Sequence, residues 1–103
     1  MAKWIDVAAA SDIPPGQKRC VEAEGRPIVV SNIEGMLYAA ANVCPHAGMP
    51  VGEGDLVKDV LTCPYHGYAY NVTTGKNVDY VDDEPLAMYA ARIENDRVEV
   101  ELP

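Results

Sequence analysis

Two short segments of this 103-residue chain combine a cysteine with a histidine. The first holds Cys44 and His46 and the second holds Cys63 and His66, with residues 47–62 between them. Thiolate sulfur and imidazole nitrogen are ligands for first-row transition metals. The chain has no other histidine, so a chance pairing of both histidines with cysteines is improbable. The pattern predicts a metal site built from two loops, each supplying one sulfur and one nitrogen.

The residues around these ligands favour rigid loops. A proline follows each cysteine and fixes the backbone φ angle there (Pro45 and Pro64). A glycine follows each histidine within two positions (Gly48 and Gly67) and lets the backbone approach a bulky group closely. The third cysteine, Cys20, has no histidine or second cysteine near it in the sequence, and we expect it to be a buried, inert thiol.

Short strands are predicted on both sides of these loops. Turn signals such as Glu24-Gly25 and Asn95-Asp96 recur at short intervals and suit tight hairpins. No segment has the periodicity of a long helix, and residues 97–102 alternate polar with apolar side chains, as in a half-buried strand. Strands are expected at residues 3–6, 17–23, 27–33, 36–41, 56–62, 68–72, 86–93 and 97–102.

The predicted fold is an all-β antiparallel sandwich or barrel. At 103 residues the chain is long enough for one domain, residues 1–103, and too short for two. Two loops rich in proline and glycine, at about 42–55 and 63–75, interrupt the strands and carry the predicted ligands. A third, acidic segment at 79–85 is expected to be a solvated surface turn.

Composition narrows the class of function. Sixteen acidic and eight basic residues give a net charge of −8, which repels a phosphate backbone and excludes nucleic-acid binding. No apolar run approaches the roughly 20 residues of a membrane span, and the first residues lack the pattern of a secretory signal. Three cysteines without such a signal do not suggest a disulfide framework. We expect a cytoplasmic protein that does not bind membranes, and a monomer.

Ligand spacing alone leaves two metal centres open. Two cysteines and two histidines satisfy a tetrahedral structural zinc ion. They equally satisfy a 2Fe–2S cluster in which two histidines replace two cysteines on one iron.

The segments around the ligands resemble the two cluster-binding boxes of the Rieske family. The first reads Asn42-Val-Cys-Pro-His-Ala-Gly-Met-Pro-Val-Gly-Glu-Gly-Asp55, and the second reads Leu61-Thr-Cys-Pro-Tyr-His-Gly-Tyr-Ala-Tyr-Asn-Val-Thr-Thr-Gly75. The chain is similar in particular to the small Rieske ferredoxins of bacterial ring-hydroxylating oxygenase systems, over essentially its whole length. The resemblance implies a Rieske-type antiparallel sandwich with a cluster-binding subdomain formed by the two loops.

The same resemblance implies one 2Fe–2S cluster and a role for each ligand. Cys44 and Cys63 would hold one iron, while His46 and His66 would hold the other iron near the protein surface. Rieske clusters have reduction potentials between about −150 and +300 mV, because histidine ligands leave the cluster less negative than four cysteines would.

Several positions near the ligands predict a potential that is low for a Rieske cluster. Rieske proteins of cytochrome bc complexes tie the two loops with a disulfide, but the matching residues here are Met49 and Tyr65. Those proteins also place a serine that hydrogen-bonds the cluster where this chain has Tyr68. Fewer hydrogen bonds to sulfur stabilise the reduced state less. Tyr70 matches a tyrosine that donates to a ligand sulfur in the high-potential proteins. It is expected either to raise the potential modestly in the same way or to be a plain aromatic residue of the core.

The resemblance implies a one-electron carrier and not an enzyme. Its expected partners are a flavoprotein reductase that supplies electrons and a terminal oxygenase that receives them, each docked transiently. A terminal oxygenase itself would need a separate iron held by two histidines and a carboxylate, and both histidines are already assigned. Two alternatives stay open: a small Rieske subunit of a nitrite-reductase-like complex, and a zinc-stabilised interaction module.

Overall fold

The structure, a computed structural model, describes residues 3–45, 48–65, 67–80 and 82–102. Over these residues the chain forms antiparallel strands and two short 3-10 helices, and no α-helix, as the sequence predicted. The elements are β1 (Lys3–Ala9), η1 (Ala10–Asp12), β2 (Lys18–Ala23), β3 (Arg26–Ile33), β4 (Met36–Ala41), η2 (Val51–Glu53), β5 (Leu56–Val57), β6 (Val60–Thr62), β7 (Ala69–Asn71), β8 (Met88–Tyr89), β9 (Ala91–Glu94) and β10 (Arg97–Leu102).

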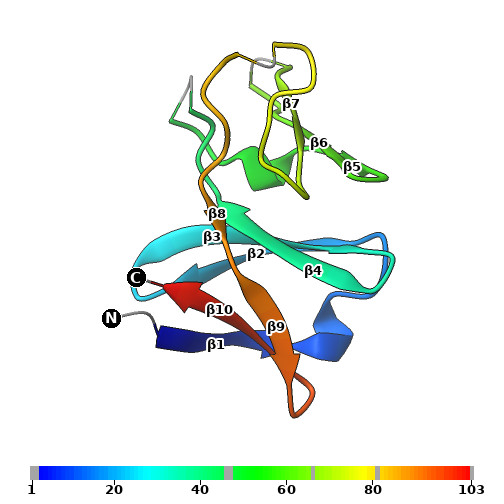
Figure 1. The fold of residues 1–103 in the computed structure, drawn as a ribbon, viewed down its shortest axis with the longest axis vertical. Helices are drawn as coiled ribbons and strands as arrows, with labels where there is room; N and C mark the ends of the chain where they lie inside the picture. The colour runs from blue at the N-terminus through cyan, green and yellow to red at the C-terminus, as the bar shows by residue number, and fades with distance from the viewer. Residues whose placement is uncertain (1–2, 46–47, 66, 81, 103) are drawn as a thin grey trace.

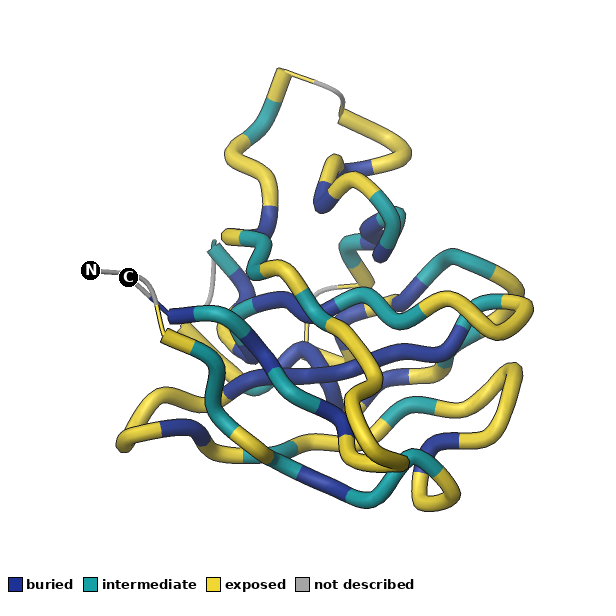
Figure 2. The backbone as a smooth tube through the Cα atoms, turned by 60° about the horizontal axis from the view of Figure 1, so that its bottom comes forward, coloured by how far each residue is buried: buried dark blue, intermediate teal, exposed yellow. Residues whose placement is uncertain are grey.

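Two sheets form the base of the molecule, in the lower half of Figure 1. One has the strand order β1-β10-β9 and the other the order β2-β3-β4-β8. Alternation along β10 directs Val98, Val100 and Leu102 into the space between these sheets, where they pack with Ile28 and Val30 of β3. Burying such side chains stabilises the fold by about 1.5–3 kcal/mol each. Figure 2 shows the long buried stretches of the backbone in this base.

Tight turns set the register of the base hairpins. Glu24 and Gly25 join β2 to β3 with φ angles of 50° and 81°, and Asn95 and Asp96 join β9 to β10 with φ angles of 52° and 63°. Two successive positive φ values match the right-handed twist of the flanking strands. Both predicted hairpin turns are therefore confirmed.

A third sheet, with the order β5-β6-β7, stands at one end of the base, in the upper half of Figure 1. It lies between β4 and β8 in the sequence, so the chain leaves the base after β4 and returns at β8. A second apolar cluster fills this region and includes Val51, Leu61 and Tyr70. The sheet and the loops around it form the expected subdomain of two loops on a β-sandwich.

The structure corrects two of the predicted strands. The expected strand 56–62 is a hairpin of β5 and β6, because Lys58 turns the chain with a φ of 57°. The expected strand 86–93 is β8 followed by β9, which pair with β4 and β10 respectively. The chain changes sheets at Ala90, whose carbonyl accepts the N–H of Glu101 at 2.9 Å. Apolar patterning does not reveal such a crossing, because residues 86–91 form one continuous apolar run in the sequence.

No helix among the described residues has the length and apolar character needed to cross a membrane.

Candidate metal centre

The first ligand loop begins just after β4. The backbone N–H of Cys44 donates to the carbonyl of Met49 at 2.8 Å, and the carbonyl of Cys44 accepts the N–H of Gly48 at 2.8 Å. Gly48 adopts a φ of 68°, in the left-handed region that glycine reaches without strain. The backbone N–H and the backbone carbonyl of Cys44 are therefore both hydrogen-bonded within the loop.

The second ligand loop begins directly after β6 and repeats this arrangement. The N–H of Cys63 donates to the carbonyl of Tyr68 at 2.7 Å, and its carbonyl accepts the N–H of Gly67 at 3.0 Å. Gly67 has a φ of 74°. The partners lie five and four residues beyond the cysteine in both loops, so the two predicted ligand loops are matched backbone units. Sequence spacing showed the residue types, but not this shared hydrogen-bond pattern.

The structure brings both predicted cysteine ligands into one buried cluster. Cys44 and Cys63 each have no solvent-exposed surface, and they share the second apolar cluster with Leu61 and Tyr70. Cys20 lies apart from this cluster, on β2, and is exposed. The expectation that Cys20 is a buried thiol is therefore wrong, because β2 is the edge strand of its sheet and leaves this residue exposed.

The predicted histidine ligands, His46 and His66, lie outside the described residues. The described residues alone hold no group of three or more His, Cys, Asp or Glu side chains suited to a metal ion. The described part of the site consists of the two cysteine sulfurs and the groups around them.

Tyr70 brings a hydroxyl to one of these sulfurs. Its side chain is fully buried, and its hydroxyl oxygen lies 3.7 Å from the Sγ atom of Cys44. Burial, followed by this contact with Cys44, raises the pKa of Tyr70 above its ordinary value. A hydroxyl that keeps its proton is a hydrogen-bond donor, and a metal-bound thiolate is an acceptor. The sequence-based prediction that Tyr70 reaches a ligand sulfur agrees with this contact.

A second tyrosine links the two loops at their exposed rim. The Tyr65 hydroxyl, beside the second ligand loop's cysteine, donates to Oε1 of Glu53 at 2.9 Å. Glu53 ends η2, so the bond joins the first loop to the second. The carboxylate of Glu53 raises the pKa of Tyr65, mainly through this hydrogen bond. Tyr65 is one of the two positions that the sequence resemblance matches to the loop disulfide of cytochrome bc Rieske proteins. The sequence analysis missed Glu53 as its partner, because no spacing rule relates residues on different loops.

The first loop also packs tightly at its start and in η2. Oδ1 of Asn42 accepts the N–H of Gly52 at 2.6 Å. A Cβ atom at Gly52 would lie 2.6 Å from Sγ of Cys20 and 2.8 Å from Oδ1 of Asn42. Glycine is therefore needed where η2 crosses β2. The sulfur of Cys20 packs against Gly52 at this crossing, so this thiol contributes to the packing of β2 on η2.

The end of the first loop rests on β6. The backbone of Gly54 approaches the carbonyl of Thr62 so closely that a Cβ atom would overlap with that oxygen. In addition, the N–H of Thr62 donates to the carbonyl of Asp55 at 3.1 Å. Because Thr62 immediately precedes Cys63, these contacts connect the end of the first loop to the start of the second.

A third loop, residues 76–83, lies beside the second ligand loop. The ring of Tyr80 meets the ring of Tyr68 edge to face, with centroids 5.9 Å apart. Oδ1 of the buried Asn77 accepts the N–H groups of Asp79 and Tyr80, both at 2.9 Å. The described residues of the segment 79–85, which are 79, 80 and 82–85, are largely exposed, as expected of a surface turn. This segment is also held against the metal centre, which the sequence analysis did not foresee.

The described residues fit a cluster with sulfur ligands. Cys44 and Cys63 supply two buried thiols on matched loops, and Tyr70 supplies a buried donor at the sulfur of Cys44. Sulfur atoms of iron–sulfur clusters are hydrogen-bond acceptors whose partners set the reduction potential. A buried hydroxyl aimed at a ligand sulfur is therefore the feature expected of a redox centre.

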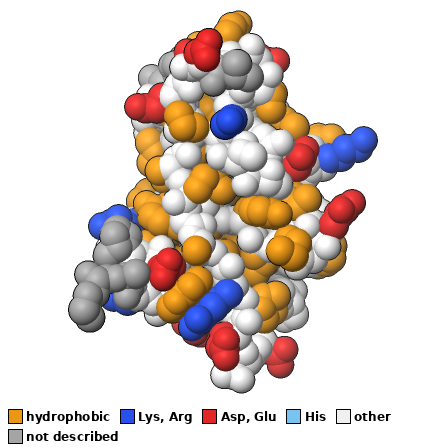
Figure 3. All heavy atoms as spheres, viewed as in Figure 1, with side chains coloured by type: hydrophobic (Ala, Val, Ile, Leu, Met, Phe, Trp, Pro, Cys, Tyr) orange, Lys and Arg blue, Asp and Glu red, His pale blue; other side chains and the backbone are white. Residues whose placement is uncertain are grey.

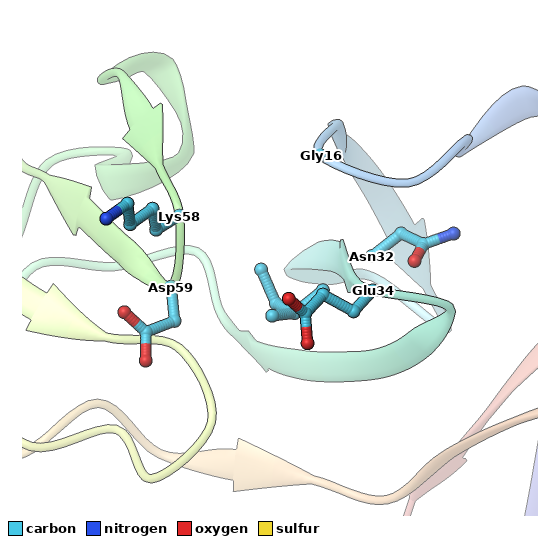
Figure 4. A pocket seen from close by; sticks show the side chains of 6 residues that line it. Gly16, Asn32, Glu34, Lys58 and Asp59 are labelled. Atoms are coloured by element: carbon cyan, nitrogen blue, oxygen red, sulfur yellow. The ribbon is translucent and has the colours of Figure 1, made fainter.

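The pocket shown in Figure 4 lies away from this centre. Its volume is about 440 Å³, and it lies between the base and the β5–β6 turn. Its lining includes Asn32, Glu34, Lys58 and Asp59. Lys58 and Asp59 precede β6 whereas Cys63 follows it, so this pocket has no part in the predicted chemistry.

Comparison with known proteins supports one family over the whole chain. The sequence model of the Rieske [2Fe-2S] domain matches residues 3–90. The ferredoxin component of the naphthalene 1,2-dioxygenase system of Pseudomonas putida is 34% identical over 97% of this chain and 96% of its own length. Ferredoxin CarAc of Metapseudomonas resinovorans is 36% identical over 94% of this chain and 92% of its own length.

Solved structures agree with these relatives. A chain in the complex of reduced oxygenase and oxidised ferredoxin of carbazole 1,9a-dioxygenase matches with a TM-score of 0.86 and 36% identity, covering 94% of this chain and 91% of its own. The ferredoxin of Sphingomonas yanoikuyae B1 matches with a TM-score of 0.88 over 98% of this chain and all of its own. At 22% identity, that second likeness shows the shared fold.

Proposed function

The chain belongs to the Rieske [2Fe-2S] domain family, and from this we propose that it is a one-electron carrier between a flavoprotein reductase and a terminal oxygenase. The observation that carries the proposal is the pair of buried cysteines on matched loops with the Tyr70 hydroxyl at one sulfur. Full-length relatives are named ferredoxin components of dioxygenase systems, which favours a carrier over a nitrite-reductase-like subunit. The family holds a 2Fe–2S cluster, which also argues against a structural zinc ion.

The proposed ligands are Cys44 and Cys63 on one iron and His46 and His66 on the other. They belong to a single Rieske domain, residues 1–103, with ligand loops at about 42–55 and 63–75. Support comes from the matched backbone of the two cysteine positions and their common burial. The histidine assignments rest on the motifs in which they occur.

The 2Fe–2S cluster, when bound, supplies reversible one-electron chemistry at a potential in the Rieske range. The protein's own contribution is to hold the sulfur ligands and to set how well a negative charge is tolerated there. The Tyr70 hydroxyl donates toward the sulfur of Cys44 and stabilises that charge. The apolar cluster around Cys63 and Leu61 excludes water and has the opposite effect.

The docking face is proposed at the tip that carries the loops. Several large apolar side chains are exposed there although such residues usually favour the core: Val43, Met49, Tyr65, Val78 and Tyr80. Weak redox encounters use small interfaces, and an apolar tip beside the metal centre suits a brief contact at short electron-transfer distance. The solved structure from the carbazole 1,9a-dioxygenase system is a complex of ferredoxin and oxygenase, which supports an oxygenase as one partner.

A cytoplasmic location is part of the proposal. No disulfide joins the three cysteines among the described residues, which suits a reducing compartment. The partners proposed above would be found in the same compartment.

Reduction of the loaded protein by a flavoprotein reductase tests this function. Purified protein is expected to be red-brown and to contain two iron and two sulfide per chain. It should accept one electron from a reductase of a ring-hydroxylating system and pass it to the matching oxygenase. A colourless protein with one zinc ion per chain, or a loaded protein that no flavoprotein reductase reduces, would contradict the proposal.

Ligand variants test the site assignment. His66→Cys should lower the reduction potential or prevent assembly, because a thiolate adds negative charge. Cys63→Ser should reduce cluster content strongly. The matched control is Cys20→Ser, which changes the same residue type outside the centre and should leave colour and potential unchanged.

A further inference from the structure

Asn77 is a buried polar residue that uses only half of its hydrogen-bonding capacity. Its side chain has no exposed surface, and its Oδ1 atom accepts two backbone N–H groups. Its Nδ2 atom has no hydrogen-bond partner among the described residues. Burying an unsatisfied donor costs about 1–3 kcal/mol. An apolar residue would avoid that cost but would lose both bonds to Oδ1, so the asparagine suits a residue that holds the backbone of the following turn.

Asn77 is joined to the strand that carries Tyr70. The two residues face each other in an isolated antiparallel bridge. Hydrogen bonds on either side fix the pairing, from Asn71 N–H to the Lys76 carbonyl at 2.8 Å and from Val78 N–H to the Ala69 carbonyl at 2.9 Å. Directly opposed residues in an antiparallel pair place their side chains on the same face. Asn77 therefore lies on the face of β7 from which Tyr70 reaches Cys44.

The two bonds to Oδ1 determine where the next residues of the third loop go. They hold the N–H groups of Asp79 and Tyr80, and the Tyr80 carbonyl then accepts the N–H of Asp83 at 2.9 Å. This turn places the Tyr80 ring against Tyr68, whose carbonyl accepts the N–H of Cys63 at 2.7 Å. A continuous set of contacts thus runs from Asn77 to the backbone of a cluster ligand.

We propose that Asn77 is a positioning residue that holds Tyr80 over the second ligand loop, where the ring limits water access and keeps the reduction potential low. The inference rests on the proposed function. Reduction adds a negative charge to the centre, and water stabilises that charge more than an aromatic cover does. Moving the cover away therefore raises the potential.

Three variants of the cluster-loaded protein test this role. Asn77→Leu has a similar size but cannot accept the two N–H groups, so hydrogen exchange at residues 79 and 80 should become faster and the midpoint potential should rise. Asn77→Asp keeps an acceptor in place, so exchange should stay slow and the added charge should hold the potential at or below that of the wild type. Tyr80→Ala removes the aromatic ring but keeps the hydrogen bond from the Asp79 N–H to Asn77. The midpoint potential should therefore rise while hydrogen exchange at residue 79 stays slow.

The outcomes separate this inference from the proposed function. Equal midpoint potentials in the wild type, Asn77→Leu and Tyr80→Ala would overturn it, and Asn77 would then serve the fold alone. If Asn77→Leu fails to fold, the midpoint potential of Tyr80→Ala alone tests the inference. Tyr80 is 58% exposed, so removing its ring leaves the core intact. A wild-type protein that holds no cluster would overturn the proposed function, and this inference with it. Loaded protein with unchanged potentials would overturn this inference only.

Discussion

Tyr70 serves both the core and the metal centre at once. Its ring fills the second apolar cluster, and its hydroxyl lies 3.7 Å from the sulfur of Cys44. The pKa of Tyr70 is raised by burial first and by Cys44 second, so the hydroxyl keeps its proton at any pH near neutrality. Toward a thiolate at Cys44, the Tyr70 hydroxyl is the group of this pair that can donate.

Tyr70→Phe should lower the reduction potential of the loaded protein while keeping the ring in the core. One hydrogen bond contributes about 1 kcal/mol, which corresponds to about 40 mV for a one-electron couple. A redox titration followed by visible absorption measures the shift. Tyr89→Phe, a change on β8 in the base cluster, is the matched control and should leave the potential unchanged. Equal potentials in Tyr70→Phe and the wild type would show that the hydroxyl does not donate to the centre.

The Tyr65–Glu53 hydrogen bond acts where a disulfide ties the loops in other members of the family. Tyr65→Phe removes the bond and should speed loss of iron to a chelator, because the two loops can then separate more readily. Glu53→Gln keeps an acceptor at the same place and should release iron at nearly the rate of the wild type. If Tyr65→Phe and the wild type lose iron equally fast, the bond has no role in holding the loops together.

At the scale of elements, the third sheet positions the ligands through close backbone packing. Gly54 and Thr62 touch through their backbones, and Thr62 directly precedes Cys63. Gly54→Ala forces the first loop away from β6, and overpacking of this kind costs about 1–3 kcal/mol. We expect lower cluster content as well as lower stability, measured by iron analysis and by thermal unfolding of the loaded protein.

A glycine in a base hairpin provides the control for this change. Gly35 has open space around it but a φ of 92°, so Gly35→Ala costs roughly 1–2 kcal/mol in backbone strain. Its cluster content should remain that of the wild type. Equal cluster content in Gly54→Ala and Gly35→Ala would show that the contact with Thr62 contributes only to general stability.

The strands were predictable where a local signal existed. The hairpins at Glu24-Gly25 and Asn95-Asp96 followed from residues that tolerate a positive φ. The division of 56–62 into β5 and β6 was missed, because a lysine at the turn carries no such signal. The change of sheets at Ala90 was also missed, since it depends on which partner strands lie nearby.

At the scale of the whole molecule, charge and shape point to brief encounters. The net charge is −8, and Figure 3 shows acidic side chains at both ends of the face in view and also among the basic ones between them. Long-range attraction to a basic partner would therefore come from the whole molecule, while the proposed docking tip would provide the contact. Such attraction weakens as salt screens it.

Electron transfer to the proposed oxygenase should slow as ionic strength rises, by roughly tenfold between low and high salt. Stopped-flow mixing of reduced carrier with oxidised oxygenase measures the rate. Asp82→Asn, on the exposed third loop, should reduce the low-salt rate more than Glu94→Gln, on the exposed end of β9 in the base. A rate independent of salt would show that the acidic residues serve solubility and not association.

The sequence by itself indicated the residues proposed to bind the metal, the all-β class and the acidic net charge. These properties depend on residue type and short-range spacing, and both can be read along the chain. Tertiary structure alone decided which groups surround the ligands. Tyr65 meets Glu53, Asn77 holds Tyr80, and Gly54 rests on Thr62 because β4, β6 and the third loop converge at one end of the fold. Contacts between separate loops depend on how the sheets pack, so no local pattern specifies them.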